Sequence, residues 1–574
     1  MTMWPNFPGR VVTRLDGTWD GAWLGEDVEL AGLDASNIEY RERLPVPGCF
    51  DCLPGCEGKR GTMAYRTVVD VTPGRAGLMR FGGIGLWAAI YVDGRRLHIC
   101  DLPYSGFDVE VPASEASRRE LTVVTDNRFD DERVVLMREW YDFYGYGGIY
   151  RPAQWHEVGA TWIDRAHVET LSVEEGRIRV TVLFGGAAAE ACDLTMRVDE
   201  GEARVFADTP VRGGRAVVEM AMPGLEAWDC GSPRLHVLTV MCGGETVRER
   251  FGLRTIGCEG QRIVLNGEPV RLFGYCRHEA HPQFGAALPE VQMVHDLRAM
   301  KAMGCNVVRG SHYPLVQRVR GHCDEMGVLV WEETLGWGYR EEQWSRPDFL
   351  EANLRQARLM VKNSFNHPSV AMWGIMNEGG SHLEENRPIY EAMIRELKEA
   401  DGTRLATYAS NRIFGGAGDR FLGLVDVVGL NAYPGWYEQG GESTRPLDEI
   451  VSCLHRYVAD IDASGGGGKP LIISEIGAGA IYGWRDPHRA HWSEEYQRDL
   501  LETVCREIVN NDRYAGVTLW QFCDTRTYDT SLALRRPRAF NNKGTFDEYR
   551  RPKPARDTVA AIFRSARKIA LPRS

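Results

Sequence analysis

The chain has 574 residues, of which 43% are hydrophobic and 26% are charged, a composition typical of soluble globular proteins. Its 68 basic and 80 acidic residues give a net charge of −12, which argues against nucleic acid or an anionic membrane as a partner, because both select basic surfaces. The length predicts three or four domains.

The N-terminal segment MTMWPNFPG has no basic region followed by an apolar one, and no apolar run reaches the roughly 20 residues of a spanning helix. We therefore expect a cytoplasmic protein without a secretory signal. Fourteen cysteines are spread along the chain, and in such a protein most should be buried thiols. Cys49, Cys52 and Cys56 form one cluster, but no fourth Cys or His lies nearby, so the sequence favours a Gly/Pro-rich surface loop over a zinc site.

The first 256 residues have the pattern of antiparallel β-sheets. Short segments such as TMAYRTVVDV and LWAAIYVDGRRL alternate apolar and polar residues and are broken by Gly, Pro and Asp. Residues 1–164 are predicted to form a jelly-roll β-sandwich. Residues 165–256 have the size of an immunoglobulin-like sandwich.

From residue 257 to 574 short apolar strands alternate with helix-period segments, as in parallel βαβ units. The segments with strand character are VRLFGYCRHE, CNVVRGSHYP, GVLVWEETL, VAMWGIMNE, RLATYASN, VDVVGLNAYP, PLIISEIGA and GVTLWQFCD. Eight such segments predict a (β/α)₈ barrel. A helix is expected over 291–303, with apolar residues at three-residue steps and Gly304 as its stop, and the run at 464–468 is expected to be a flexible loop.

In a (β/α)₈ barrel the catalytic groups lie at the C-terminal ends of the strands. These ends carry carboxylates, amides and aromatic rings, namely His278-Glu279, His312, Glu332-Glu333, Asn377-Glu378, Tyr433, Glu475 and Trp520. Glu378 ends the fourth strand and Glu475 the seventh, nearly across the barrel mouth from each other. Retaining glycosidases need two carboxyls about 5–5.5 Å apart, one to protonate the leaving oxygen and one to attack the anomeric carbon. Either glutamate alone could be a helix cap or a solvated charge, so it is the pair that predicts a glycosidase.

The chain resembles glycoside hydrolase family 2 over essentially its full length. The resemblance is carried by FGLRTI, RGSHYP, NHPSVAMWGIMNE and IISEIGA, which occur in this order. It implies that Glu378 is the acid/base, Glu475 the nucleophile and Asn377 a donor to the sugar 2-hydroxyl, with no cofactor and no metal. It also implies that His312, Tyr433 and Trp520 line the sugar subsite, with Tyr433 hydrogen-bonded to the nucleophile. Gly379 departs from the family, in which a proline commonly follows the acid/base, and this puts the local loop conformation in question.

The segment after the eighth strand suggests the sugar. Asn541 and Lys543 resemble the Asn-x-Lys motif with which β-glucuronidases grip the C6 carboxylate, and a Lys ammonium beside an amide donor suits an anion. From spacing alone, NNKG would instead be an Asn/Gly turn with a solvated lysine. By the same resemblance, Tyr437 contacts the carboxylate and Asp142 reaches the 4-hydroxyl. Either Arg536 or Arg538 should face the substrate, and their spacing leaves open which.

The prediction is therefore a retaining β-glucuronidase that acts on a small-molecule or oligosaccharide uronide. A β-galacturonidase, which needs the same grip on the other C4 epimer, is the nearest alternative, followed by a β-galactosidase. The short segment ETLGWGYREEQWSRPDF after the third strand predicts an open entrance for the aglycone. By analogy with the family we expect a homo-oligomer.

Two other classes of protein agree less well with the sequence. A metalloenzyme is disfavoured because His278 and His281 are three residues apart after a strand, whereas a helical zinc motif needs a spacing of four. A non-catalytic carbohydrate-binding protein would suit the sixteen tryptophans and the two sandwiches, but it has no reason to hold the glutamate pair.

Overall fold

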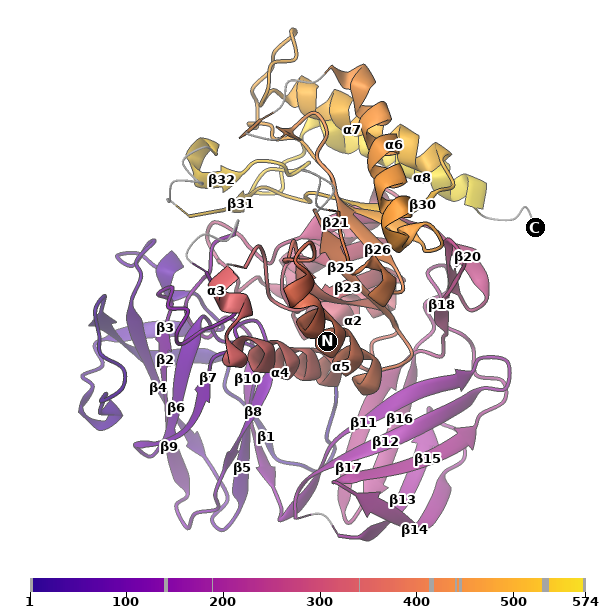
Figure 1. The fold of residues 1–574 in the computed structure, drawn as a ribbon. Helices are drawn as coiled ribbons and strands as arrows, with labels where there is room; N and C mark the ends of the chain where they lie inside the picture. Colours follow the sequence, from indigo (N-terminus) through magenta and orange to yellow (C-terminus); the bar gives the residue numbers. More distant parts are fainter. Residues whose placement is uncertain are drawn as a thin grey trace.

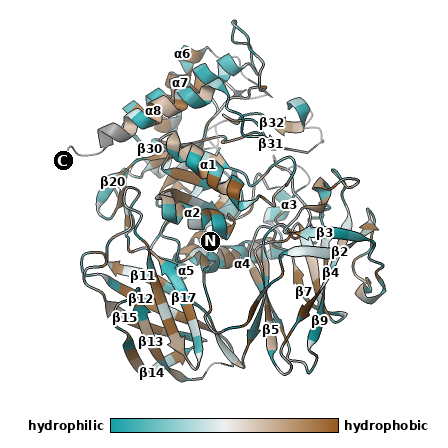
Figure 2. Cartoon of the chain, turned by 180° about the vertical axis from the view of Figure 1, so that it is seen from behind, coloured by the Kyte–Doolittle hydropathy of each residue, from teal (hydrophilic) through white to brown (hydrophobic). Residues whose placement is uncertain are grey.

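The structure is a computed structural model that describes residues 4–138, 143–187, 189–339, 341–411, 418–438, 441–442, 446–528 and 536–570. Two β-sandwich domains lie side by side beneath a helix-covered barrel (Figure 1). Figure 2 shows hydrophobic residues concentrated in the strands, with hydrophilic residues along the outer helices. The predicted fold class, two β-sandwiches followed by a (β/α)₈ barrel, is confirmed.

The first domain packs two antiparallel sheets face to face. One sheet contains, in order, β1 (Val12–Arg14), β10 (Ala153–Val158), β5 (Ala76–Phe81) and β8 (Phe107–Val111). The other contains β3 (Glu42–Val46), β2 (Gly17–Gly25), β4 (Thr62–Asp70), β9 (Arg118–Asp126), β6 (Trp87–Val92) and β7 (Arg95–Cys100). Trp19, Met63 and Trp155 are buried in the core between them.

The second domain is a sandwich built from one continuous ladder. Its order is β11 (Thr161–Ser172), β12 (Arg177–Gly186), β15 (Arg215–Ala221), β14 (Arg204–Arg212), β13 (Ala191–Val198), β16 (His236–Cys242) and β17 (Glu245–Phe251). Strand β14 pairs with β15 at one end and with β13 along the rest, so it joins the two halves around their shared core. In β15 exposed and buried residues alternate without a break, as period-two patterning requires.

One prediction about the β region needs correction and another is refined. The boundary expected at 164/165 falls inside β11, which already begins at Thr161, because β10 ends at Val158 and only Gly159 and Ala160 separate the two strands. The cysteine cluster lies in a turn-rich segment whose Pro54, Gly55 and Glu57 are exposed, in line with the expected surface loop. Its Cys49 and Cys56 are nevertheless buried, and the thiols of Cys49 and Cys52 lie against Gly285 of the barrel. Among the described residues, no three His, Cys, Asp or Glu side chains are grouped as metal ligands, and no helix is both long and apolar enough to cross a membrane.

All eight predicted barrel strands are present, parallel and closed into a ring. They are β21 (Leu272–Arg277), β22 (Val307–Gly310), β23 (Leu329–Glu333), β24 (Val370–Asn377), β25 (Leu405–Ser410), β26 (Val428–Asn431), β29 (Leu471–Glu475) and β30 (Tyr514–Leu519). A small sheet of β18 (Ile256–Glu259), β19 (Arg262–Leu265) and β20 (Glu268–Val270) precedes them, and its Ile263 shares a core cluster with Leu272 and Val307. The boundary expected at 256/257 thus falls within β18.

The barrel is surrounded by helices. They are α1 (Glu290–Ala302), α2 (Gln317–Met326), α3 (Glu341–Trp344), α4 (Pro347–Ser364), α5 (Arg387–Ala400), α6 (Leu447–Ile461), α7 (Glu494–Asn510) and α8 (Pro554–Ala570). Short 3₁₀ turns cover Ala35–Asn37, Phe50–Cys52, Glu384–Asn386, Leu422–Leu424 and Pro537–Ala539. Small hairpin strands β27 (Tyr437–Glu438), β28 (Gly441–Glu442), β31 (Thr525–Arg526) and β32 (Phe540–Asn541) follow the sixth and eighth barrel strands.

Two details of the helices differ from the sequence expectation. In α1, Leu297 and Met300 are buried but Val291 is 76% exposed, because three-residue steps drift by about 60° each around a helix of 3.6 residues per turn. The glycine run is not wholly a loop, since a π-helical turn, Asp462–Gly466, continues α6 into it.

Asp296 of α1 is the buried centre of a charge cluster that ties the helix to the barrel. It accepts hydrogen bonds from Arg277 of β21 (2.9 Å), from Gln292 (2.8 Å) and from Arg550 after β30 (3.2 Å). Asp296 and Arg277 are at most 1% exposed, so each charge depends on the other for solvation.

The variant Asp296→Asn should lower the thermal unfolding midpoint by roughly 5–10 °C, because it leaves two buried guanidinium groups without their anion at a cost of about 3–5 kcal/mol. Differential scanning calorimetry measures the change. Asp512→Asn, at a side chain that is 100% exposed, is the matched control and should leave the midpoint within about 1 °C. Equal midpoints for both variants would contradict the prediction.

Candidate active site

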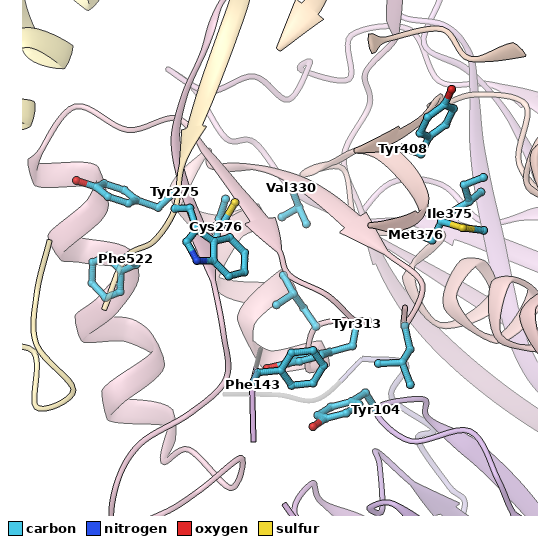
Figure 3. Close-up of a cluster of buried hydrophobic side chains, with 14 of the residues drawn as sticks. Tyr104, Phe143, Tyr275, Cys276, Tyr313, Val330, Ile375, Met376, Tyr408 and Phe522 are labelled. Carbon is cyan, nitrogen blue, oxygen red and sulfur yellow. The ribbon is translucent and has the colours of Figure 1, made fainter. Parts of the chain in front are cut away.

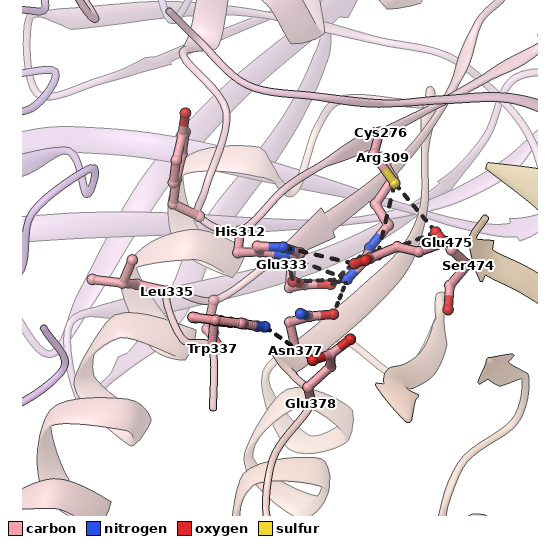
Figure 4. A network of polar contacts seen from close by, with 12 residues as sticks. Cys276, Arg309, His312, Glu333, Leu335, Trp337, Asn377, Glu378, Ser474 and Glu475 are labelled. Atoms are coloured by element: carbon pink, nitrogen blue, oxygen red, sulfur yellow. Dashed lines mark hydrogen bonds and ion pairs between the residues drawn. The ribbon is translucent and has the colours of Figure 1, made fainter. Parts of the chain in front are cut away.

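The two glutamates predicted to carry the chemistry lie together at the mouth of the barrel. Glu475 is the last residue of β29, and Glu378 follows the last residue of β24. Figure 4 shows both carboxyl groups turned toward the same space, with Asn377 and Arg309 between them. Glu475 is 3% exposed. The positions therefore match the arrangement expected of an acid/base and a nucleophile on facing strands.

Arg309, the first residue of RGSHYP, organises the floor of this space. Its fully buried guanidinium donates to Oε1 of Glu475 (2.8 Å), to both oxygens of Glu333 (2.8 and 3.1 Å) and to Oδ1 of Asn377 (2.9 Å). Burial also raises the pKa of the Glu333 carboxyl, and Arg309 opposes that shift. One cation thus sets the positions of three acceptor side chains from strands β23, β24 and β29. A guanidinium group can do this because it is planar and has five N–H donors.

Burial dominates the electrostatics of Glu475. Loss of solvent raises its pKa to about 8, and the charge of Glu378 adds to the rise. Arg309 and the hydroxyl of Tyr433, which donates a 2.7 Å hydrogen bond to Oε2, lower it. Glu475 is buried whereas Glu378 is partly exposed, and the two neighbouring carboxyls are expected to hold one proton between them at neutral pH, as an acid and a nucleophile require.

The variant Tyr433→Phe should move the acid limb of the kcat/KM profile to higher pH. The tyrosine hydroxyl favours the ionised form of Glu475, so its removal raises the pKa of that carboxyl, and a nucleophile must be ionised to attack. Activity on an aryl glycoside measured between pH 4 and 9 tests the shift. A limb that stays in place or moves to lower pH would contradict the assignment of Glu475 as nucleophile.

Within the described residues, three N–H donors hold the carboxyl of Glu378. Asn431 Nδ2 donates to Oε1 (2.8 Å), while Trp337 Nε1 (3.0 Å) and Asn411 Nδ2 (2.9 Å) donate to Oε2. Glu378 itself has a φ of +49°, an uncommon conformation for a residue with a side chain, of the kind found at functional sites. A Cβ at Gly379 would lie 2.3 Å from the Tyr390 hydroxyl, which explains why this chain lacks a proline there.

Asn377 is oriented by its neighbours. Its Oδ1 accepts from Arg309 and from Asn431, both at 2.9 Å, so the amide cannot turn over without losing both bonds. Within the described part of the chain its Nδ2 has no acceptor. This leaves an N–H available for a sugar hydroxyl, in agreement with the role expected from the resemblance.

His312 and Trp520 form an aromatic floor. Their rings stack with centroids 5.0 Å apart, and His312 Nδ1 lies 3.0 Å from Glu333. Burial and the adjacent Arg309 lower the pKa of His312 well below its usual value, which favours the neutral form of the ring. His278 meets the edge of Trp520 at 5.4 Å.

The first domain reaches this floor directly. Arg151, which is 3% exposed, donates to Glu279 (2.8 Å) and to the carbonyl of Pro314 (2.7 Å). Tyr104 of the same domain stacks on Tyr313 at 3.9 Å, as Figure 3 shows. The sandwich therefore fixes the loops after β21 and β22, which carry part of the floor. Asp142, expected to contact the 4-hydroxyl, lies outside the described residues.

Lys543 lies on the same side of the site as Tyr433. It is 2% exposed, and its Nζ donates to the hydroxyl of Tyr437 (2.5 Å) and faces the rings of Tyr437, Trp436 and Tyr433 at 4.5, 5.5 and 5.8 Å. This excludes a solvated lysine in a surface turn. Asn541 is buried beside it and uses Oδ1 to accept the backbone N–H of Lys543 (3.4 Å).

The two candidate arginines diverge. Arg536 Nη2 lies 3.4 Å from the Tyr437 hydroxyl and so faces the Lys543 cluster. Arg538 pairs with Glu548 at 2.7 Å and its side chain is 45% exposed. The structure thus brings Arg536 to the site and places Arg538 at the surface.

Arg536→Ala should lower kcat/KM for a uronide about tenfold or more, because it removes a charge-assisted hydrogen bond to the anion. Arg538→Ala, the matched control in the same segment, should stay within about twofold, as expected for an exposed ion pair. Steady-state kinetics on one aryl uronide compares the two variants. A larger loss at Arg538 than at Arg536 would reverse this assignment.

Several residues of the site were not predicted as such. Arg309, Trp337, Asn411 and Asn431 each contact Glu378, Glu475 or Asn377. The sequence places Glu333 at a strand end but does not predict its role. The available signal was a charged or amide residue at the end of an otherwise apolar strand, as with Arg309 after Val307-Val308 and Asn431 after Gly429-Leu430.

Comparison with known proteins agrees with this geometry. Residues 256–566 match the family described as "Glycosyl hydrolases family 2, TIM barrel domain". The chain belongs to glycosyl hydrolase family 2. In sequence, the chain is similar to the β-glucuronidase of Streptococcus agalactiae, with 26% identity over 95% of each chain. Human β-glucuronidase is 27% identical over 75% of this chain, and the match spans 66% of the human protein.

Similar solved structures cover nearly the whole chain. The β-galacturonidase of Eisenbergiella tayi, solved with galacturonate bound, is 32% identical with a TM-score of 0.87, covering 97% of this chain and 98% of that one. The β-glucuronidase of Bifidobacterium dentium, in complex with coumarin-3-O-glucuronide, has a TM-score of 0.86 at 23% identity over 98% of both chains, which shows the shared fold.

Proposed function

We propose that this glycoside hydrolase removes terminal β-linked uronic acids with retention of configuration. The observation that carries the proposal is the cluster of Lys543, Arg536 and Tyr437 beside Tyr433, which itself holds Glu475. Two cations and a phenol at one end of the sugar subsite suit a carboxylate and have no counterpart on a neutral hexose. The names of similar proteins, β-glucuronidases and a β-galacturonidase, support the same substrate class.

In the proposed mechanism Glu475 attacks the anomeric carbon while Glu378 gives its proton to the leaving oxygen, and the bond between that oxygen and the anomeric carbon breaks. Glu378, now ionised, takes a proton from water. The water oxygen then displaces Glu475 from the anomeric carbon, and the sugar leaves with its original configuration. Asn377 donates to the 2-hydroxyl as charge develops on the ring.

The C4 epimer separates two candidate substrates. Glucuronide is the sugar predicted from the sequence, and that preference rests on Asp142. Galacturonide is the second candidate, and a specific observation favours it. The galacturonidase of known structure is 32% identical to this chain over nearly its whole length, whereas the glucuronidases of known structure are 21–24% identical to this chain. The homo-oligomer expected by analogy stays a prediction.

A panel of 4-nitrophenyl β-glycosides tests the proposal, with glucuronide, galacturonide, galactoside, glucoside and mannoside measured at equal concentration. We expect kcat/KM for at least one uronide to exceed that for each neutral sugar by about 100-fold, the loss when a buried charged partner is left unmatched. The ratio of the two uronides decides the epimer. A neutral sugar as the best substrate would refute the uronide proposal.

A further inference from the structure

A cavity separate from the candidate active site lies where the three domains meet. It encloses about 110 Å³. The first domain contributes Phe81 and Phe107, the second contributes Arg165 of β11, and the barrel contributes Leu315 and Arg318 around the start of α2. Since benzene fits an apolar cavity of about 150 Å³, this space can hold a molecule of about four or five non-hydrogen atoms.

Arg165 brings to this cavity a buried cation without an ion pair. It is 9% exposed, and among the described residues its guanidinium donates only to the carbonyl of Lys362 (2.7 Å), while its Nε has no acceptor. Of the nearby carboxyls, Asp164 pairs with Arg80 and with Lys362 (2.8 Å). Burial raises the pKa of Glu249 to about 7, so that carboxyl is only partly ionised at neutral pH. A buried guanidinium in these surroundings calls for a further negative charge.

Other donors line the same space. Val316 caps α2 at the cavity wall, and this helix has neither a side-chain cap nor an acidic residue in its first turn, so its positive end favours an anion. Arg151 and Arg320, 3% and 4% exposed, also line the cavity, and within the described part of the chain the Nε of each has no acceptor. Asp108 is the one acidic residue among the described lining residues. The wall is therefore rich in N–H donors and poor in negative charge.

We infer that this cavity binds a small carboxylate. The carboxylate oxygens accept N–H groups from Arg165 and from the first turn of α2, and a short alkyl chain lies against Phe81, Phe107 and Leu315. An organic anion suits the space better than inorganic phosphate, because aromatic and aliphatic side chains form part of the wall. The inference concerns a second site and does not rest on the proposed function.

The bound anion joins all three domains, because Arg165 belongs to the second, Phe81 to the first and α2 to the barrel. Only Tyr313 separates His312 of the active-site floor from Pro314 in the cavity wall. Binding therefore stabilises the arrangement of the domains together with the loop after β22.

Sodium propanoate is the probe, and saturation-transfer NMR on the full chain measures its binding. We expect a Kd of about 1–10 mM for the wild type, at least fivefold weaker binding for Arg165→Met, and no binding of the neutral isostere propanamide in sodium chloride of equal concentration. Arg179→Met, at a 39% exposed side chain of β12 that pairs with Glu169 and Glu219, is the matched control and should bind as the wild type does. Lys543→Met should also retain the binding, which separates this site from the candidate active site.

A second variant supplies the missing charge from the chain itself. Gln317→Glu places a carboxyl in the cavity wall at the first residue of α2, so it should weaken propanoate binding at least fivefold and raise the thermal midpoint of the ligand-free protein by about 2 °C. Loss of binding in Lys543→Met but not in Arg165→Met would overturn the inference and place the carboxylate in the active site. Equal binding by Arg165→Met, Gln317→Glu and the wild type, equal binding of propanamide, or tighter binding of inorganic phosphate would also overturn it. No arm of the experiment uses a glycoside, so failure of the uronide proposal leaves this test intact.

Discussion

Replacing Glu475 with alanine should lower kcat/KM for the best β-glycoside by about 10⁴-fold or more, equivalent to about 5 kcal/mol of transition-state stabilisation. The variant keeps Glu378 and its three donors but has no group to form the glycosyl-enzyme, so neither step of the double displacement can proceed. Initial rates with 4-nitrophenyl substrates measure the loss. Residual activity within about tenfold of the wild type would show that Glu475 is not the nucleophile.

Rescue by azide distinguishes Glu475 from Glu378. In Glu475→Ala the anion can occupy the space of the lost carboxylate and attack the anomeric carbon once, which gives an α-glycosyl azide. In Glu378→Ala the glycosyl-enzyme still forms from an activated aryl substrate, and azide displaces it to give the β-azide. The anomeric configuration, read by NMR, thus assigns each carboxyl. Exchange of the two products between the variants would reverse the roles.

Most of the fold was predictable because local pattern and global position agree. Each barrel strand is a short apolar run between turn residues, and the C-terminal ends of such strands must meet at one mouth once the ring closes. Glu378 and Glu475 could therefore be placed together from their strand positions alone. The first domain boundary was less accurate, because Gly159, which separates β10 from β11, and Asp164, which lies within β11, are both residue types common in turns.

The supporting residues of the site could not be predicted in the same way. Arg309 matters because it joins Glu333, Asn377 and Glu475 across three strands, and such a contact exists only after the barrel has closed. Arg536 and Arg538 are two residues apart in an irregular segment, where no periodicity states which side chain points inward. Contacts from the first domain, such as the hydrogen bond from Arg151 to Glu279, join residues that are 128 positions apart in the sequence, so no local pattern predicts them.

The fold also holds in place the cluster of Lys543, Arg536 and Tyr437 that is proposed to select the substrate. Lys543 follows Asn542, whose carbonyl accepts hydrogen bonds from Ala480 N (2.9 Å) and Lys553 Nζ (3.1 Å). Lys553 in turn pairs with buried Asp524 at 2.8 Å. The segment is thus held from both sides, and Lys543 Nζ is held beside the hydroxyl of Tyr437. Rigid placement of a charge is what gives discrimination rather than general attraction.

Lys543→Met should therefore lower kcat/KM for the preferred uronide about 100-fold and change that for a neutral β-glycoside by no more than about threefold. Methionine keeps most of the volume, but the substrate carboxylate then loses a buried cation, at a cost of about 3 kcal/mol. The ratio of the two kcat/KM values, measured on matched 4-nitrophenyl glycosides, is the readout. Because the ratio cancels any general loss of active enzyme, it reports on recognition alone.

Lys553→Met provides the structural comparison for this experiment. It removes the cation that pairs with Asp524. Burial raises the pKa of Asp524 to about 6, and Lys553 lowers it. The variant should therefore destabilise the same segment while Lys543 stays in place to bind the substrate carboxylate. We expect a lower thermal midpoint and similar losses on uronide and neutral substrates, leaving their ratio within about threefold of the wild-type value. If Lys543→Met also left that ratio unchanged, Lys543 would hold the segment in place as Lys553 does, and the selection of an anionic sugar would have to come from other residues.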